Sequence, residues 1–189
     1  GSSVMVNDIL VPVIKRSPVN LSSQEEIGIE FNTNYSHSKN WRIGGNVNFY
    51  QSEIIGNYNG IIYDSKNLIW SGRLNNYLKL FSSVDWQTRI SYRGPQKTAI
   101  STRKGSISTN TAFSKDIFGD KMTLTFKIND IFETQKWRLE TLSETYKTYS
   151  ESSWRGGRNF NLSLIYRFNQ KKSQSNNRPG YEDYGGEGF

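Results

Sequence analysis

The sequence has no cysteine and a single histidine, His37. Without cysteine the chain cannot form a disulfide, use a thiolate nucleophile or hold a metal through sulfur. His37 stands beside serine and lysine in a turn-like stretch, so we expect a solvated turn residue there and no metal or catalytic site. No phosphate-binding glycine loop or carboxylate cluster accompanies it, and we predict a protein that is not an enzyme and needs no cofactor.

The chain also lacks any apolar run near the roughly 20 residues that a transmembrane helix needs, which excludes a helical membrane protein. Hydrophobic residues make up only 34% of its 189 residues, whereas aromatic residues reach 14%. Disordered chains are poor in aromatic residues, so disorder explains this composition badly. A β-sheet with one apolar face and one face in contact with water explains this composition better. In a membrane β-barrel the two kinds of face alternate along each strand, so the mean hydropathy of the chain is polar.

The net charge of the chain is +7. A basic protein can bind nucleic acid when lysine and arginine gather in one patch. Here these residues are spread along the chain, and we expect no nucleic-acid partner.

Apolar and polar residues alternate with a period of two in seven segments, the pattern of a strand with one apolar face. The apolar positions are Ile27, Ile29, Phe31, Thr33 and Tyr35; Trp41, Ile43, Gly45, Val47 and Phe49; Trp70, Gly72, Leu74, Leu78 and Leu80; Val84, Trp86, Thr88, Ile90 and Tyr92; Ile107, Thr109, Thr111 and Phe113; Met122, Leu124, Phe126 and Ile128; and Phe160, Leu162, Leu164, Tyr166 and Phe168. A weaker eighth strand is expected near residues 4–15, where Pro12 predicts a distorted element. The alternation predicts an all-β fold class. Together with the connections and the aromatic residues described next, it predicts an antiparallel up-and-down transmembrane β-barrel segment of about eight strands, part of a larger barrel.

The connections between these segments alternate between short and long. Residues 36–40, 81–83 and 116–120 form short turns, whereas residues 54–67, 93–104 and 134–153 form longer loops. Because successive turns fall at opposite ends of an up-and-down sheet, all the short turns lie at one end. Outer-membrane barrels have this asymmetry, with short periplasmic turns and longer extracellular loops.

Aromatic residues mark both ends of the apolar faces. Tyr35, Trp41, Trp86, Phe113 and Phe168 lie toward the short turns, and Phe49, Trp70 and Tyr92 lie toward the long loops. We predict two aromatic girdles at the level of the lipid headgroups, with ordinary cross-strand packing as the alternative for any single residue. The opposite face would then line a water-filled interior, and the alternative for its residues is simple exposure to solvent. The predicted interior residues are Glu30, Arg42, Arg73, Lys79, Asp85, Arg89 and Arg93.

The period alone does not say which face points inward. A soluble lipocalin-like barrel that binds a ligand would place the apolar face in its lumen. The turn asymmetry and the girdles favour lipid on the outside. Residues 1–168 hold the predicted barrel strands, and residues 169–189 lose the alternation and are expected to form a disordered periplasmic tail.

Several short motifs carry a resemblance to a known family. They are Val13-Ile14-Lys15-Arg16, Trp41-Arg42-Ile43, Asn48-Phe49-Tyr50-Gln51-Ser52, Trp70-Ser71-Gly72-Arg73-Leu74, Gln87-Thr88-Arg89, Tyr92-Arg93-Gly94-Pro95, Ser114-Lys115-Asp116, Asp130-Ile131-Phe132 and residues 164–172. Over roughly residues 10–175 the chain resembles the C-terminal part of the outer-membrane β-barrel family of Bacteroidetes-type bacteria, which is similar to TonB-dependent receptors.

This resemblance implies a larger barrel of about 22 strands in the outer membrane of a Gram-negative bacterium. The barrel would bind a ligand and transport it, and its plug domain, which contacts the TonB system, would lie outside this sequence. The expected partners are outer-membrane lipid, a surface lipoprotein and the barrel assembly machinery, which would read Phe160, Leu162, Leu164, Tyr166 and Phe168. The alternative is a self-contained eight-stranded barrel that serves as an anchor or adhesin.

Overall fold

The computed structural model describes residues 2–13, 20, 23–98, 100–142 and 146–168. Within these ranges every element is a β-strand except one short 3-10 helix, Trp154–Gly156 (η1). None of the described residues form a helix that is long and apolar enough to span a membrane. The predicted tail, residues 169–189, lies outside the described residues.

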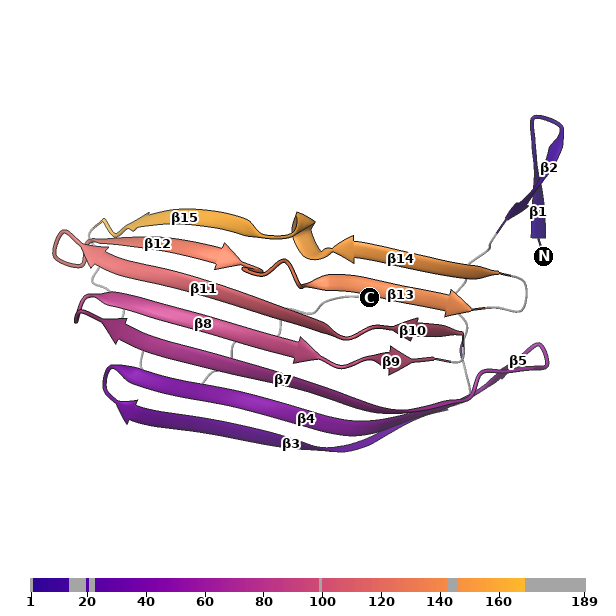
Figure 1. Ribbon diagram of the computed structural model, residues 1–189, viewed down its shortest axis with the longest axis horizontal. Coiled ribbons are helices and arrows are strands. Elements are labelled where there is room, and N and C mark those ends of the chain that lie inside the picture. Colours follow the sequence, from indigo (N-terminus) through magenta and orange to yellow (C-terminus); the bar gives the residue numbers. More distant parts are fainter. Residues whose placement is uncertain (1, 14–19, 21–22, 99, 143–145, 169–189) are drawn as a thin grey trace.

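Seven strands form one antiparallel sheet in which each strand pairs with its neighbour (Figure 1). The order from edge to edge is β15 (Asn159–Tyr166), β12 (Met122–Asn129), β11 (Ser106–Ile117), β8 (Val84–Arg93), β7 (Ser65–Leu80), β4 (Trp41–Ile55) and β3 (Ser23–Ser38). These are the seven segments that the period-two alternation predicts. The all-β, antiparallel up-and-down fold class is therefore confirmed.

The short turns lie together at one end of this sheet, at the left of Figure 1. Phe81 and Ser82, between β7 and β8, have φ values of 47° and 57°, the backbone of the tight hairpin turn that matches strand twist. The β3–β4 turn is tighter than predicted, because β3 continues to Ser38. His37 therefore sits in a strand, beside a bulge, and its ring packs 5.2 Å from that of Trp41. The expectation of a turn residue there is wrong.

The long connections lie at the other end, and they are hairpins where loops were expected. They contain β5 (Asn57–Tyr58) and β6 (Ile61–Ile62), β9 (Gln96–Lys97) and β10 (Ser101–Arg103), and β13 (Lys136–Leu142) and β14 (Lys147–Ser153). β9, β10, β13 and β14 come from two different connections, and they pair in a second sheet of order β14-β13-β10-β9. This second sheet extends the wall beyond the seven-stranded sheet (Figure 1).

The expected eighth strand near residues 4–15 is a separate hairpin of β1 (Ser2–Val6) and β2 (Ile9–Val13). Its turn residues, Asn7 and Asp8, have φ values of 47° and 60°. Asparagine and aspartate tolerate this left-handed backbone, so the pair reverses the chain where one continuous strand was predicted.

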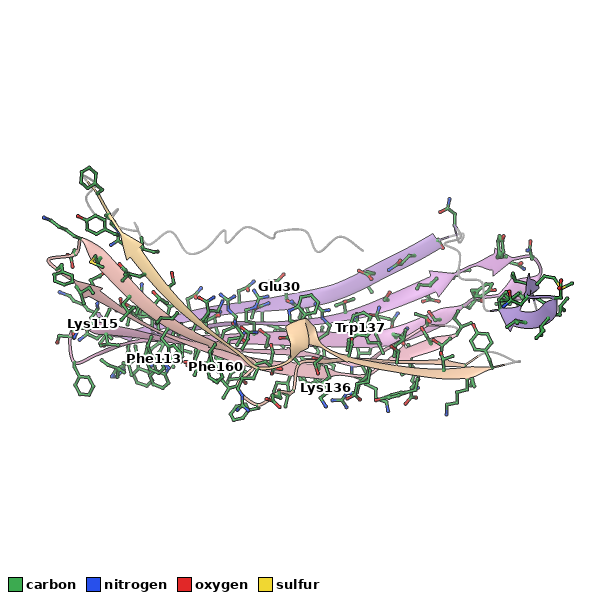
Figure 2. The ribbon with its side chains drawn as sticks, turned by 90° about the horizontal axis from the view of Figure 1, so that it is seen from above. Glu30, Phe113, Lys115, Lys136, Trp137 and Phe160 are labelled. Carbon is green, nitrogen blue, oxygen red and sulfur yellow. The ribbon has the colours of Figure 1, made fainter. Side chains whose placement is uncertain are left out.

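The strand registers bring all seven apolar faces to the same side of the sheet. One row across six strands joins Trp41, Leu78, Trp86, Phe113, Phe126 and Leu162. Many large apolar side chains of this face are exposed: the exposed fraction is 36% for Ile90, 38% for Phe126 and 57% for Leu164. Among the described residues the only buried hydrophobic side chain is Ile69, which belongs to the other face. The protein is thus a single curved layer, with Glu30 on its hollow side and Phe113 and Phe160 on the opposite side (Figure 2).

Candidate functional site

The apolar face of the seven-stranded sheet is an uncharged band with charges at both ends. Among the described residues, no acidic or basic side chain occupies this face between the two aromatic rows. Beyond Phe49 and Trp70, the same face carries an ion pair between Glu53 and Lys66, 2.9 Å apart. At the short-turn end Lys115 follows two positions after Phe113. The band therefore has the limits that a hydrocarbon layer would impose.

Polar atoms within the band find their partners inside the sheet. The indole Nε1 of Trp41 donates to Asn76 Oδ1 over 2.9 Å, and that of Trp86 donates to Thr111 Oγ1 over 2.9 Å. The Thr111 hydroxyl in turn donates to the carbonyl oxygen of Gln87. An unsatisfied polar group in hydrocarbon costs several kcal/mol, so these internal bonds suit a face that meets lipid.

The structure arranges the predicted girdle residues in two rows. Phe49 and Trp70 stack at 6.3 Å between ring centroids, and Trp70 and Tyr92 stack at 4.3 Å. In the other row Trp86 and Phe113 stack at 6.1 Å, while Tyr35 and Trp41 lie near the β3–β4 turn and Phe168 follows the end of β15. On β4, the eight residue steps between the rows span about 20 Å of depth at a strand tilt of about 40°. Their position at the headgroups remains a prediction.

All seven predicted interior residues lie together on the opposite, polar face, and their lining of a wet lumen remains a prediction. Toward the short turns, the Arg42 guanidinium lies 4.5 Å from the centre of the Tyr77 ring. Asp85 accepts a hydrogen bond from Tyr77 over 2.6 Å and pairs with Lys79 over 2.8 Å. Further along, Arg89 Nε donates to Asn75 Oδ1 over 2.9 Å. Toward the short turns, the charges of Lys79 and Asp85 thus neutralise each other at close range.

The polar face is hollowed by a cavity of about 290 Å³ where the seven-stranded sheet meets the second sheet. Its walls come from β4, β7, β8, β10, β11, β13 and η1, and they contain Asn46, Asn48, Ser71, Gly72, Arg73, Ser91, Tyr92, Arg93, Arg103, Lys104, Ser106, Ser108, Gln135, Lys136, Trp137 and Trp154. Arg73, Arg93 and Arg103 bring guanidinium groups to these walls, and none of the lining residues is acidic. Lys136, next to Trp137 on β13, points to the other side of the sheet (Figure 2). We take this basic cavity as the candidate binding site.

Arg103 is the most enclosed arginine of the basic cavity. Its Nη2 donates to Gln96 Oε1 over 2.6 Å, and its guanidinium lies 5.2 Å from the Trp137 ring centroid. Its Nε is buried and has no hydrogen-bond partner in the described part of the chain. Burial, and then the positive charge of Arg93, lower the pKa of Arg103 from its ordinary value. The cavity thus holds a cation at an electrostatic cost.

The sequence predicts Arg73 and Arg93 as interior residues, but it does not predict the rest of the basic cavity. Arg103 and Trp137 fall in connections expected to be loops. Residues 136–142 do alternate, with Trp137, Leu139 and Thr141 on one side, and this signal predicts a strand. No local pattern shows that β13 pairs with β10, more than thirty positions earlier in the chain.

A buried aspartate holds the corner where β12 leaves the seven-stranded sheet. Asp130, 2% exposed with a φ of 48°, accepts hydrogen bonds from the backbone N–H groups of Thr134 and Gln135. Its own N–H donates to Asn110 Oδ1 over 2.9 Å. The following Ile131 N–H donates to the carbonyl of Thr109, which ties the corner to β11. This anchoring directs β13 toward the basic cavity.

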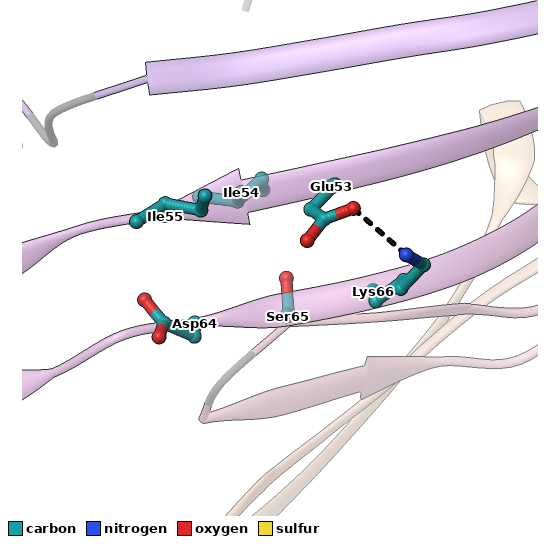
Figure 3. Close-up of a pocket in the computed structure, with 6 residues that line it drawn as sticks. All are labelled: Glu53, Ile54, Ile55, Asp64, Ser65 and Lys66. Carbon is teal, nitrogen blue, oxygen red and sulfur yellow. Dashed lines mark ion pairs between the residues drawn. The ribbon is translucent and has the colours of Figure 1, made fainter.

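A second cavity, of about 230 Å³, lies at the outer end of β4 and β7 and is lined by Glu53, Ile54, Ile55, Asp64, Ser65 and Lys66 (Figure 3). Its two strongest polar groups are already engaged. Glu53 pairs with Lys66, and Asp64 Oδ1 accepts the backbone N–H of Gly56 over 3.0 Å. Over the described ranges no set of three or more acidic, histidine or cysteine side chains could hold a metal ion. The ion pair and the hydrogen bond thus join the two strands at the base of the β5–β6 hairpin.

A curved sheet with an uncharged, exposed apolar face and a charged opposite face is the wall of a membrane-spanning β-barrel. Consistent with this class, the chain matches the Outer membrane protein beta-barrel family over residues 2–166, and it belongs to that family. The protein is located in the outer membrane. No curated protein and no solved structure matches the chain. The alternative of a soluble barrel with an apolar lumen is wrong, because the chain belongs to an outer-membrane family and the apolar face, with Phe113 and Phe160, lies opposite the hollow side of the sheet (Figure 2).

Proposed function

We propose that this protein is a TonB-dependent receptor-like barrel that binds a ligand in its polar interior and transports it across the outer membrane. The observation that carries the proposal is the polar face, which holds all seven predicted interior residues and the basic cavity. Glu30 on this face lies on the hollow side of the sheet (Figure 2). The second sheet places the cavity at the end of the long hairpins, which would be the extracellular end. A ligand arriving from outside would meet the basic cavity first.

The two edges of the sheet support a barrel larger than these strands. β3 and β15 are the outer strands of the seven-stranded sheet, and they do not pair with each other. Unpaired backbone N–H and C=O groups are not tolerated in hydrocarbon, so further strands must cover both edges. We propose that these belong to a barrel of about 22 strands of the Bacteroidetes type. The same edges argue against a self-contained eight-stranded anchor or adhesin.

The proposal includes the partners of such a barrel. A plug domain outside this sequence would contact the TonB system, and a surface lipoprotein would cover the extracellular end. The barrel assembly machinery would bind β15, whose Phe160, Leu162, Leu164 and Tyr166 are exposed on one face, and the exposed Phe168 that follows it. Because the basic cavity combines arginine, amide and hydroxyl groups with indole rings, the protein would act by binding and not by catalysis.

The test is a comparison of solute uptake in the native bacterium. A panel of radiolabelled sugars, chelated metals and small peptides is offered to wild-type cells, to cells that lack this protein and to cells that lack TonB. We expect both deletions to abolish uptake of the same solute. If uptake of every solute persists without the protein, or if the affected solute still enters without TonB, the proposed function is wrong.

A further inference from the structure

The charges of the basic cavity are not balanced within its walls. Lys104 and Lys136 pair with Glu140 and Glu151, at 2.6 and 3.1 Å. The three arginines Arg73, Arg93 and Arg103 differ, because within the described part of the chain none of them forms an ion pair with a carboxylate. Three guanidinium groups therefore face one hollow without a counter-charge.

In the empty cavity this arrangement has an electrostatic cost at Arg103, whereas Arg73 and Arg93 are exposed to water. A cation that leaves water without a partner loses part of its hydration free energy, and like charges nearby add to the cost. Arg103 carries this penalty most clearly, since its Nε is buried without a hydrogen-bond partner and Arg93 faces it. Asn48 Oδ1, on the same wall, is buried without a partner as well. Both atoms are enclosed in the wall, so their unmet hydrogen bonds add to the cost of the empty cavity.

The remaining walls indicate what else the ligand carries. Trp137 and Trp154 are 45% and 46% exposed at the cavity, so their rings can stack on the apolar face of another ring. The serine side chains Ser71, Ser91 and Ser106 offer hydroxyl groups that can donate or accept hydrogen bonds. The volume of about 290 Å³ lies at the lower limit of small-molecule sites, which suits one or two ring units.

We infer that the basic cavity binds a small anionic ligand whose carboxylate, sulfate or phosphate groups are mounted on rings, as in an acidic sugar. Arg73, Arg93 and Arg103 would each donate to the anionic oxygens, where the planar guanidinium fork matches a carboxylate. Trp137 would stack on the ring. This inference rests on the proposed function, since it requires the polar face to be the interior of the barrel.

The test uses the native protein extracted in detergent from outer membranes, with isothermal titration at about 0.15 M salt, where distant charges are screened. The probes are digalacturonate and its dimethyl ester, which has the same rings without the charges. We expect digalacturonate to bind and the ester to bind at least tenfold more weakly. The exposed-arginine variants Arg73→Gln and Arg93→Gln should each weaken binding about tenfold, as for the loss of one charge-assisted hydrogen bond.

The matched control is Lys127→Gln, which removes one positive charge from the same face away from the basic cavity. We expect the control to bind like the wild type, and Trp137→Leu to weaken binding of the probe without abolishing it. Equal binding of the ester, or equal loss in the control, would show a general charge effect and overturn the inference. Absence of probe binding to the folded wild type would also overturn it.

Failure of this inference and failure of the proposed function can be told apart. If digalacturonate does not bind but a solute still depends on both this protein and TonB for uptake, the receptor stands and only the ligand class is wrong. If digalacturonate binds with the expected arginine dependence but no uptake depends on TonB, the site stands in a barrel that binds without TonB-driven transport.

Discussion

Neighbouring residues of one strand meet different surroundings in this protein. In β15, Leu164 lies on the apolar face and is 57% exposed, whereas Ser163 lies on the polar face. Because Cβ atoms alternate across a strand, this division follows from the sequence. The partners of the indole groups do not, since Trp41 and Asn76 belong to different strands and only the β4–β7 register brings them within 2.9 Å.

We expect Leu164→Arg to destabilise the protein in lipid by about 1–2 kcal/mol, because Leu164 lies on the apolar face but shares its register row with Lys115, toward the end of the uncharged band, where the cost of an arginine falls below its mid-membrane value. The measurement is urea unfolding of the native barrel in phospholipid vesicles, followed by tryptophan fluorescence. Ser163→Arg is the matched control on the polar face and should cost less than about 1 kcal/mol. Equal costs for the two variants would contradict the outward orientation of Leu164.

Among the elements, the β13–β14 hairpin carries a surface network of charged side chains in addition to its backbone pairing. The hydrogen bond from Lys104, followed by the charge of Lys104, lowers the pKa of Glu140 below its ordinary value of 4.5. The pKa of Glu151 is lowered as well, first by the hydrogen bond from the Tyr149 hydroxyl and then by Lys136. All of these groups are on the surface, so each pair contributes little and salt screens it. The network lies beyond the aromatic rows, outside the membrane-spanning part of the sheet.

These lowered pKa values predict a hairpin that loosens in acid. The stabilisation is complete above about pH 4.5, the unfolded value, and is lost as the pH falls through the lower folded pKa of each glutamate. We expect amide exchange of residues 147–153, corrected for intrinsic rates, to rise below pH 4.5 while that of β8 stays slow. In the double variant Glu140→Gln and Glu151→Gln this acid transition should disappear. Persistence of the transition in the double variant would assign it to other groups.

For the molecule as a whole, the decisive feature is the pair of open edges. All 16 residues of β3 are exposed, and so are six of the eight residues of β15. We expect residues 1–189 alone, refolded into phospholipid vesicles, to give no protease-resistant monomer whose electrophoretic mobility changes on heating. The physical reason is that both edges expose unpaired backbone groups to hydrocarbon. The native outer-membrane protein is the control and should show the heat-dependent shift.

A heat-modifiable monomer formed by residues 1–189 alone would mean that β3 and β15 can close on each other. That result would contradict the larger barrel and favour the self-contained anchor or adhesin.

The strands and their outward faces could be predicted from the order of the residues, because alternation is a local property and a strand turns every second side chain to the same side. The end of the sheet that holds the short turns could also be predicted, because successive turns of an up-and-down sheet fall at opposite ends. The turn at Asn7 and Asp8 carries a local signal too, although the apolar residues on both sides favour one continuous strand.

The basic cavity depended on the tertiary structure. Arg73, Arg93, Arg103 and Trp137 come from β7, β8, β10 and β13, and only the strand pairing brings them to one hollow. The pairing of β10 with β13 depends on the corner at Asp130, whose backbone hydrogen bonds are made only when the chain is folded. Alternation specifies the side of a strand on which a residue lies, but contacts between distant segments are selected by the free energy of the whole sheet.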